Sequence, residues 1–398
     1  MKILRVAPDI YPHMVGGFGI HIHEMSKEQV RLGHDVTVYT ASEDVEPEYE
    51  ADDGYYVRNF KPLIKVLGNS IMPSMLFDLL EEQSNYDIVH AHSHLFFSTN
   101  LSAVARKLGG STPLVITNHG LNSQTAPKWF QDFYTATGAR LTFAAADKIL
   151  CYTETEKQEL VDLGIKSEKI EVIHNGIDTD LFVPAREPCF DKKNLLWVGR
   201  YAKGKGLDYL IEAFSILKTR YPDVTLTLVG KGPEQDHISQ KIRDLNLESS
   251  IIMKDFVPNS EIVSMYQNSS IFVLPSLEEG VPRTILEAMS CGIPVVCSRL
   301  PQLVDIVEGC GLLVPVKDSQ ALAESISKVL SDSSLAEEFR ENGRRNVVEN
   351  HSWKDTVKKT VQLYKELVWN NERGNVIETH SWKDTVKKTV QHYKELMP

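Results

Sequence analysis

The chain has 398 residues, of which 42% are apolar and 24% are charged, and its formal net charge is −11. This length exceeds one ordinary hydrophobic core and predicts two or three domains, of which two is the preferred number. Residues 1–182 contain 15 Lys and Arg against 25 Asp and Glu, and residues 183–398 contain 28 against 29, so neither half has the basic surface of a general nucleic-acid binder.

The cysteines argue against both a zinc site and a disulfide framework. None of the five belongs to a C-x-x-C pair; they are Cys151, Cys189, Cys291, Cys297 and Cys310. The N-terminus is apolar only over residues 1–6, and no later run approaches the roughly 20 apolar residues of a membrane span. We therefore expect a cytoplasmic protein without a signal peptide or a membrane-spanning segment.

The first elements predict the opening of a doubly wound parallel sheet. A buried strand at 3–6 leads through the turn at Gly16-Gly17-Phe18-Gly19 into a helix at 20–32, and a second strand follows at 36–40. A strand, a glycine loop, a helix and a parallel strand are how a Rossmann-like sheet begins. The G-x-G-x-x-G dinucleotide fingerprint is missing, so a nicotinamide site is not expected.

Strands and helices continue to alternate in two series, which predicts an α/β protein. In the first series we expect strands at 88–90, 114–117, 148–152 and 170–173, with helices at 76–83, 101–108 and 155–163. A polar, proline-bearing segment at 182–188 fits an interdomain linker. The second series predicts strands at 195–198, 225–229, 251–253, 271–274, 295–297 and 311–314, with helices at 206–220 and 235–246. We expect two Rossmann-like domains, 1–183 and 184–350, facing each other across a cleft.

The C-terminus contains an internal repeat. Residues 346–367 recur as 375–396 with a few substitutions, and each copy places Val, Val, Tyr and Leu at helical spacing. Two copies are too few for a solenoid, so 351–398 is expected to be a duplicated amphipathic helix. We expect the first copy to dock on the body, while the second is redundant, frayed, or engaged with a neighbouring chain in a homo-oligomer.

The stretch from Pro275 to Val296 has the pattern strand, loop, helix, strand. Gly280 and Pro282 hold an irregular loop at the start of the helix, where unpaired amides and the positive end of the helix dipole favour an anion. Arg200 and Lys205 lie in another glycine-rich loop that follows a strand, and two such cations can converge on one phosphate. The alternative for this second loop is an ordinary solvated basic loop.

Glu279 and Glu287 belong to the same stretch. Eight residues at helical rise separate them by roughly 12 Å, which is more than the about 5–9.5 Å of a glycosidase carboxylate pair. They are better suited to hold two hydroxyl-bearing parts of one extended ligand. The alternative is a surface glutamate and a glutamate favoured by the helix dipole.

Histidines gather in the first domain, at His21, His23, His90, His92, His94 and His119. The alternation of a strand points His90 and His92 to one face, which keeps a metal site open. Histidines with partners in the core or in loops are the commoner outcome. His119 follows a strand, in Asn118-His119-Gly120, and is the best candidate of the group to touch a ligand.

In this order and context, the motifs resemble those of the retaining glycosyltransferases of family 4, which have the GT-B fold. The resemblance covers nearly the whole chain and rests on Gly16–Gly19, His90-Ala91-His92, Asn118-His119-Gly120, Asn175-Gly176-Ile177-Asp178, Val198-Gly199-Arg200 with Lys205-Gly206, Val229–Glu234, and Glu279 with Glu287 in E-x7-E spacing. It implies a C-terminal helix that returns to the first domain, and a metal-independent, retaining transfer with no resident cofactor.

The resemblance also implies roles for single residues. The second domain would bind a nucleotide-sugar donor: Arg200 and Lys205 the diphosphate, Glu287 the ribose, and Glu279 the sugar. His119 would contact the transferred sugar, and the first domain would bind a hydroxyl acceptor, which is a sugar, a small metabolite or a lipid-linked glycan. The remaining donor contacts would be Gly16, Gly17, Gly230, Phe256, Val257, Gly280, Val281, Pro282, Arg283 and Thr284.

Two departures from the family pattern bear on the donor. Ser298–Pro301 stands where relatives often have paired glycines and a proline, and Glu278 replaces a frequent aromatic residue. The alternatives to transfer are a nucleotide-sugar epimerase, a phosphorylase-like enzyme, or a non-catalytic binding or scaffold protein. Arg58, Lys61 and Lys65, which lie among apolar residues, suggest peripheral contact with a membrane surface.

Overall fold

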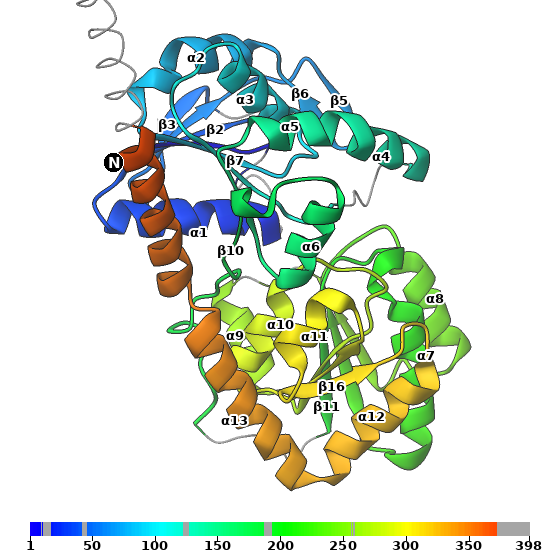
Figure 1. The fold of residues 1–398 in the computed structure, drawn as a ribbon. Helices are drawn as coiled ribbons and strands as arrows, with labels where there is room; N and C mark the ends of the chain where they lie inside the picture. Colours follow the sequence, from blue (N-terminus) through cyan, green and yellow to red (C-terminus); the bar gives the residue numbers. More distant parts are fainter. Residues whose placement is uncertain are drawn as a thin grey trace, which may run out of the picture. The chain divides into compact units, whose positions relative to one another are not determined.

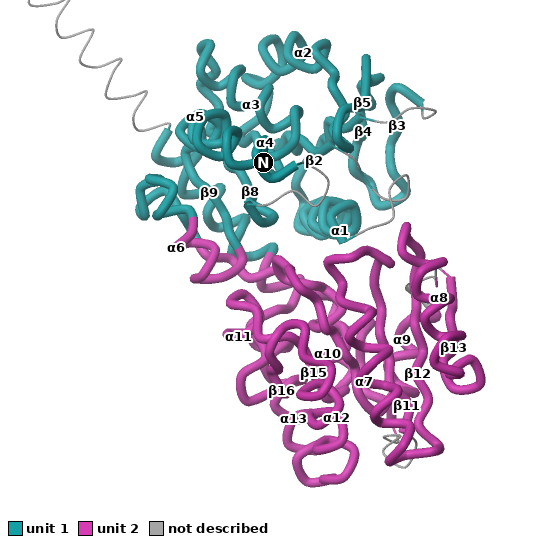
Figure 2. Tube along the Cα trace, turned by 90° about the vertical axis from the view of Figure 1, so that its right-hand side faces the viewer, with its two compact units in different colours: residues 1–151, 160–171, 357–398 teal, residues 152–159, 172–356 magenta. Residues whose placement is uncertain are grey.

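A computed structural model describes residues 1–8, 10, 17–41, 46–121, 127–186, 193–255, 257 and 259–371. Contacts between residues divide the chain into two compact units (Figure 2). Unit 1 comprises residues 1–151, 160–171 and 357–398, and unit 2 comprises residues 152–159 and 172–356. The expected domains, with boundaries after 183 and 350, remain predictions about which segments fold independently.

Unit 1 is built on an eight-stranded sheet with the order β10-β9-β8-β7-β1-β2-β4-β3. Its pairs from β9 to β4 are parallel, and β3 runs antiparallel to β4. The strands are β1 (Lys2–Val6), β2 (Asp35–Thr40), β3 (Glu48–Glu50), β4 (Tyr56–Asn59), β7 (Ile88–His92), β8 (Leu114–Thr117), β9 (Lys148–Cys151) and β10 (Ile170–Val172). The strand order reverses between β1 and β7, which is where ligands bind in open α/β sheets.

Helices cover both faces of this sheet (Figure 1). One face packs against α1 (Gly17–Arg31) and the other against α3 (Phe97–Lys107), which follow the strands β1 and β7. The other helices that lie wholly or partly in unit 1 are α2 (Ser74–Glu82), α4 (Lys128–Tyr134), α5 (Arg140–Ala145) and α6 (Glu154–Asp162). A two-stranded hairpin, β5 (Ile64–Val66) and β6 (Asn69–Ile71), lies outside the main sheet.

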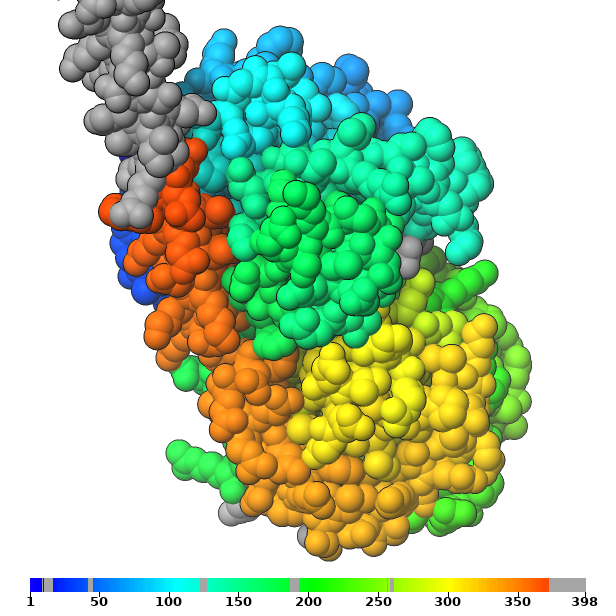
Figure 3. Space-filling view, viewed as in Figure 1, coloured from blue at the N-terminus to red at the C-terminus, as the bar shows by residue number. Residues whose placement is uncertain are grey.

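The helix at 353–371 begins in unit 2 and continues in unit 1. Its surface, orange to red, adjoins that of the blue N-terminal segment (Figure 3). Tyr364 is fully buried, and its hydroxyl contacts His90 Nδ1 on β7. The first copy of the repeat therefore docks as expected, whereas the second copy lies outside the described residues.

Unit 2 contains a fully parallel six-stranded sheet with the order β13-β12-β11-β14-β15-β16. The strands are β11 (Asn194–Val198), β12 (Thr225–Val229), β13 (Ile251–Lys254), β14 (Ile271–Leu274), β15 (Val295–Ser298) and β16 (Gly311–Val314). The helices are α7 (Leu207–Arg220), α8 (Gln235–Asp244), α9 (Asn259–Gln267), α10 (Arg283–Ser290), α11 (Pro301–Val307), α12 (Ser319–Ser331) and α13 (Ser333–Asn350). The order reverses between β11 and β14, the counterpart of β1 and β7 in unit 1.

The interior of unit 2 explains why its strands read as continuous apolar runs. Strands covered on both faces need apolar side chains at nearly every position, and β14 is buried at all four residues. The large side chains Trp197, Phe214, Tyr266 and Phe272 fill the space between the sheet and its helices. The four described cysteines are buried and form no disulfide with one another. No helix among the described residues is both long and apolar enough to cross a membrane.

Candidate functional site

Glycines bring three loops of unit 2 together at the carboxyl ends of β11, β12 and β14. Gly206 has a φ of +65°, and a Cβ there would lie 2.0 Å from the carbonyl oxygen of Pro275. Gly230 has a φ of +137°, and its Cβ would lie 1.9 Å from the carbonyl oxygen of Gly199. Neither position accepts a side chain. The loop that carries Arg200 and Lys205 is thereby held against the loops that follow β12 and β14.

Lys205 and Glu279 form an ion pair at this point. Lys205 Nζ lies 2.5 Å from Glu279 Oε1, and the Ser276 hydroxyl donates to the same oxygen at 2.7 Å. The exposed side-chain fractions are 17% for Lys205 and 7% for Glu279, so solvent screens the pair only weakly. The sequence predicted both residues as site residues but did not predict that they bind each other.

Arg200 completes the basic side of the site. It follows β11, is exposed, and makes no hydrogen bond or ion pair with the rest of the described chain. An exposed guanidinium in the same loop as the Lys205 of a part-buried ion pair gives this edge of the sheet a local positive charge. A phosphate group is the ligand that suits it.

Helix α10 begins next to these residues. No described side chain caps its N-terminus at Pro282, so the first backbone amides remain available to an anion. On this helix Glu287 accepts a hydrogen bond from the Tyr266 hydroxyl at 2.8 Å, and its other oxygen lies 3.7 Å from Arg283 Nε. Burial raises the pKa of Glu287, and Arg283 opposes this effect. Tyr266 thus fixes the orientation of a carboxylate that is still 13% exposed.

A buried carboxyl group that sequence reasoning missed lies beside the same loop. A Cβ built on Gly280 would lie 3.9 Å from Glu156 Oε1, and this oxygen has no hydrogen-bond partner among the described residues. Oε2 accepts from the Tyr152 amide at 2.7 Å. Burial raises the pKa of Glu156 to about 7. The available signal was the pattern Thr153-x-x-Glu156, which is typical of a capping box at a helix start.

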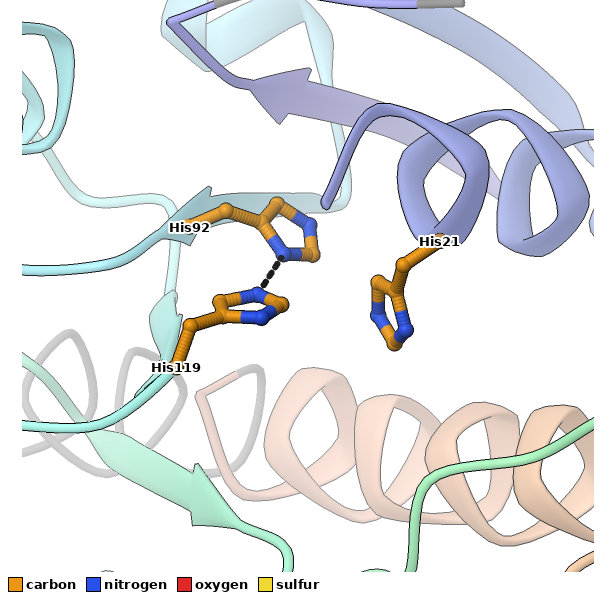
Figure 4. A group of neighbouring side chains, drawn as sticks. All are labelled: His21, His92 and His119. Atoms are coloured by element: carbon orange, nitrogen blue, oxygen red, sulfur yellow. Dashed lines mark hydrogen bonds between the residues drawn. The ribbon is translucent and has the colours of Figure 1, made fainter. Parts of the chain in front are cut away.

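In unit 1, His119 follows β8 and meets two other histidines (Figure 4). Its Nε2 lies 3.2 Å from Nδ1 of His92, the last residue of β7, and the ring of His21 on α1 lies 5.1 Å from the His119 ring. Phe18 packs on His119 with ring centroids 4.6 Å apart. Burial, with Arg5 adding to it, lowers the pKa of His119 to about 3.

The remaining histidines have structural surroundings. His23 shares a hydrogen bond of 2.7 Å with the Tyr55 hydroxyl, and His94 packs against Phe143. His90 is buried on β7 and bonds to Thr117. Of the histidines predicted in the first domain, His21, His92 and His119 come together, and His90 stacks on His92 with ring centroids 4.2 Å apart. His23 and His94 have other neighbours.

The ring nitrogens of the three clustered histidines are close enough together to bind one metal ion, but the hydrogen of His92 lies on the nitrogen that would have to bind it. Their ligand nitrogens lie within 4.8 Å of one another. However, Arg5 Nη1 lies 2.6 Å from His92 Nε2. Arginine only donates, so His92 Nε2 accepts, and the hydrogen of the neutral ring must be on Nδ1. The His92 nitrogen that faces the cluster therefore has no lone pair for a metal.

The other residues predicted to contact the donor differ in how exposed they are. Gly17 is exposed at the start of α1, and Val257 is half-buried. Val281, Pro282, Arg283 and Thr284 are half-buried around the start of α10. Gly16 and Phe256 lie outside the described residues.

Comparison with known proteins matches both halves of the chain to glycosyltransferase models. Residues 186–346 match the model "Glycosyl transferases group 1", and residues 15–181 match "Glycosyltransferase Family 4". An uncharacterised glycosyltransferase of Methanocaldococcus jannaschii is 28% identical, with 92% of this chain and 98% of the relative covered. A D-inositol 3-phosphate glycosyltransferase of Salinispora arenicola is 27% identical, with 89% and 88% covered.

Solved structures share the fold. A sucrose-phosphate synthase of Thermosynechococcus elongatus has a TM-score of 0.76 at 22% identity, with 92% of this chain and 98% of that chain covered. Anabaena HepE in complex with UDP has a TM-score of 0.75 at 20% identity, with 92% and 100% covered. This is the GT-B architecture of two parallel-sheet α/β domains.

Proposed function

Because the chain belongs to the group 1 glycosyltransferases of family 4, we propose that it moves a hexose-type sugar from a nucleoside-diphosphate sugar to an acceptor hydroxyl. The observation that supports this donor class is the Lys205–Glu279 pair at the strand-order reversal of unit 2, in a loop that also carries the exposed Arg200. This edge offers two cations for a diphosphate and a carboxylate for sugar hydroxyls. HepE, which shares the fold, was solved with UDP-glucose.

The leaving diphosphate is the centre of the proposed mechanism. When the bond from the sugar C1 to the phosphate oxygen breaks, negative charge grows on the diphosphate. Arg200, Lys205 and the uncapped amides of α10 are the groups that stabilise it. Because these cations are part of the chain, the proposal requires no divalent metal.

Glu279 holds the sugar in this proposal. Lys205 and Ser276 orient its carboxylate, which prepares it to accept hydrogen bonds from sugar hydroxyls. Glu287, oriented by Tyr266, accepts from the ribose. We propose retention of configuration, with the acceptor hydroxyl entering on the face that the diphosphate leaves.

Peripheral membrane contact is a second, narrower proposal. Arg58 does not contribute to it, because this side chain forms ion pairs with Glu48, Asp78 and Glu82. Lys61 and Lys65 are exposed next to Leu63 and Ile64, whose exposed fractions are 80% and 56%. A hairpin of this composition suits a membrane interface. Co-sedimentation with vesicles, compared between the wild type and Leu63→Ser/Ile64→Ser, tests it.

The test of the proposed function is turnover with a panel of UDP-, GDP- and ADP-sugars, with and without mixed sugar and inositol-phosphate acceptors. Acceptor-dependent release of nucleoside diphosphate, unchanged by a chelator, supports transfer. Interconversion of the donor sugar without an acceptor indicates an epimerase, and sugar phosphate made from a polymer and inorganic phosphate indicates a phosphorylase. Donor binding without turnover indicates a binding protein and refutes the proposal.

A further inference from the structure

We propose that Arg5 and His92 position His119 through a hydrogen-bond chain that runs in one direction, so that His119 presents its Nδ1–H to the ligand. Arg5 and His92 are thus positioning residues for His119, which we propose contacts the transferred sugar, as the sequence predicts. The inference rests on the proposed function for that contact, but the direction of the chain follows from the structure of unit 1 alone.

The direction begins at Arg5. This residue lies on β1 and is fully buried, and its Nη1 lies 2.6 Å from His92 Nε2. A guanidinium has five N–H donors and no acceptor. His92 Nε2 therefore accepts, and the hydrogen of the neutral ring must be on Nδ1.

The second step passes from His92 to His119. His92 Nδ1 lies 3.2 Å from His119 Nε2. Because His92 Nδ1 carries a hydrogen, it donates, and His119 Nε2 accepts. A neutral His119 then has its own hydrogen on Nδ1. The tautomer of His119 is thus set by an arginine that it does not need to touch.

The hydrogen-bond chain requires the rings of His92 and His119 to be neutral, and both are. Burial, then His90 and Arg5, holds the pKa of His92 well below its ordinary value. Burial and Arg5 lower the pKa of His119 to about 3. At neutral pH His119 is therefore a hydrogen-bond donor to a ligand oxygen rather than a group that titrates. Its donor strength is increased by the cation at the far end of the chain.

The sheet of unit 1 fixes the position of Arg5, the first residue of the hydrogen-bond chain. Parallel pairing of β1 with β7 places Arg5 opposite His90, and Arg5 Nη2 donates to Gln29 Oε1 of α1 at 2.5 Å. His90 Nδ1 lies 3.4 Å from Arg5 Nη1, and His90 Nε2 lies 2.6 Å from the Thr117 hydroxyl. Because β7 pairs with β1, the buried guanidinium of Arg5 lies within hydrogen-bond distance of His92 Nε2.

Two substitutions of His92 separate the positioning role from packing. His92→Asn keeps a donor where Nδ1 stood but loses the group that accepts from Arg5. His92→Gln keeps an acceptor where Nε2 stood but loses the donor to His119. The two variants are similar in polarity and size, so each is the control of the other. Circular dichroism checks that both fold.

We expect His92→Gln to lower kcat by about 10- to 100-fold, as loss of a partner that orients a functional histidine does elsewhere, with little change in the donor KM. His92→Asn should recover most of this loss. Equal loss in both variants, or a normal kcat in His92→Gln, would overturn the proposal.

Nitrogen-15 NMR of histidine-labelled full-length protein gives a readout that does not need turnover. The wild type should show His119 with hydrogen on Nδ1 from pH 6 to pH 8, and His92→Gln should show a mixed population. Hydrogen on Nε2 in the wild type refutes the chain even if the enzyme is active. Absence of transferase activity with the expected spectrum refutes the proposed function and leaves the chain intact.

Discussion

The carboxyl group of Glu156 should make the stability of unit 2 depend on pH in an unusual direction. Most acidic residues have folded-state pKa values at or below those of the unfolded chain, so they add stability as pH rises. Glu156 is the opposite case, because burial raises its pKa from 4.5 to about 7. The folded protein therefore keeps a proton that the unfolded chain has released.

The size of the effect follows from the shift. One pKa unit corresponds to about 1.4 kcal/mol, so a carboxyl group whose pKa rises from 4.5 to about 7 changes the free energy of unfolding by about 3 kcal/mol. This stability is fully present below the unfolded pKa near 4.5 and is lost as pH rises to about 7. Above that value the carboxylate is buried, with Oε1 lacking a described partner.

Glu156→Gln removes the titration and keeps a carbonyl that can accept from the Tyr152 amide. Urea titrations at pH 5, 6, 7 and 8, followed by tryptophan fluorescence, should show the variant gaining about 2.5 kcal/mol over the wild type between the lowest and highest pH. Glu154→Gln is the control, because that side chain is 72% exposed on the same helical turn. Parallel pH profiles for wild type and Glu156→Gln would refute the reasoning.

Three further predictions concern unit 2. Lys205→Ala and Glu279→Ala should each lower kcat by about 10²- to 10³-fold with unchanged circular dichroism; near-normal rates would remove that residue from the site. Gly206→Ala should destabilise by more than Gly309→Ala in urea titrations, because both glycines have positive φ but only Gly206 has a backbone oxygen 2.0 Å from the added Cβ; equal losses would contradict this. Tyr266→Phe should raise the donor KM roughly three- to tenfold by releasing Glu287; an unchanged KM would show that Tyr266 does not orient a donor contact.

Most strands of the two sheets were predictable because their buried residues form short β-branched runs between helical segments; β3 and β4, at one edge of the unit 1 sheet, were not predicted. The hairpin of β5 and β6 was not, since every residue of β5 is exposed and an exposed strand leaves no apolar pattern to detect. Helix α13, which follows the last strand of the second sheet, was also not predicted. In α13 only four of 18 residues are buried, so its apolar stripe is thin.

The sequence predicts candidate site residues where a motif marks a loop, but it does not predict the contacts between them. Lys205 and Glu279 were each predicted, but their ion pair joins residues 74 apart, and sequence spacing says nothing about such a distance. Arg5 lies within the apolar strand Ile3–Val6, where a single charged residue suggests an edge or an exposed face. Only the reversal of strand order, which brings β7 beside β1, shows that Arg5 is buried under two histidines.

The cations that lie near the strand-order reversals differ in exposure between the two units. This difference indicates which part of the donor each unit is suited to bind. In unit 2 Arg200 is exposed and Lys205 is shared with a single carboxylate, so a diphosphate can reach both without breaking a network. In unit 1 the cation of Arg5 is fully buried, and it is hydrogen-bonded to the Gln29 side chain and to the neutral His92, which leads to His119. A buried arginine cannot take up a phosphate, but it can polarise a neutral donor. The charges therefore favour unit 2 for the diphosphate, and they favour unit 1 for a contact with an uncharged hydroxyl.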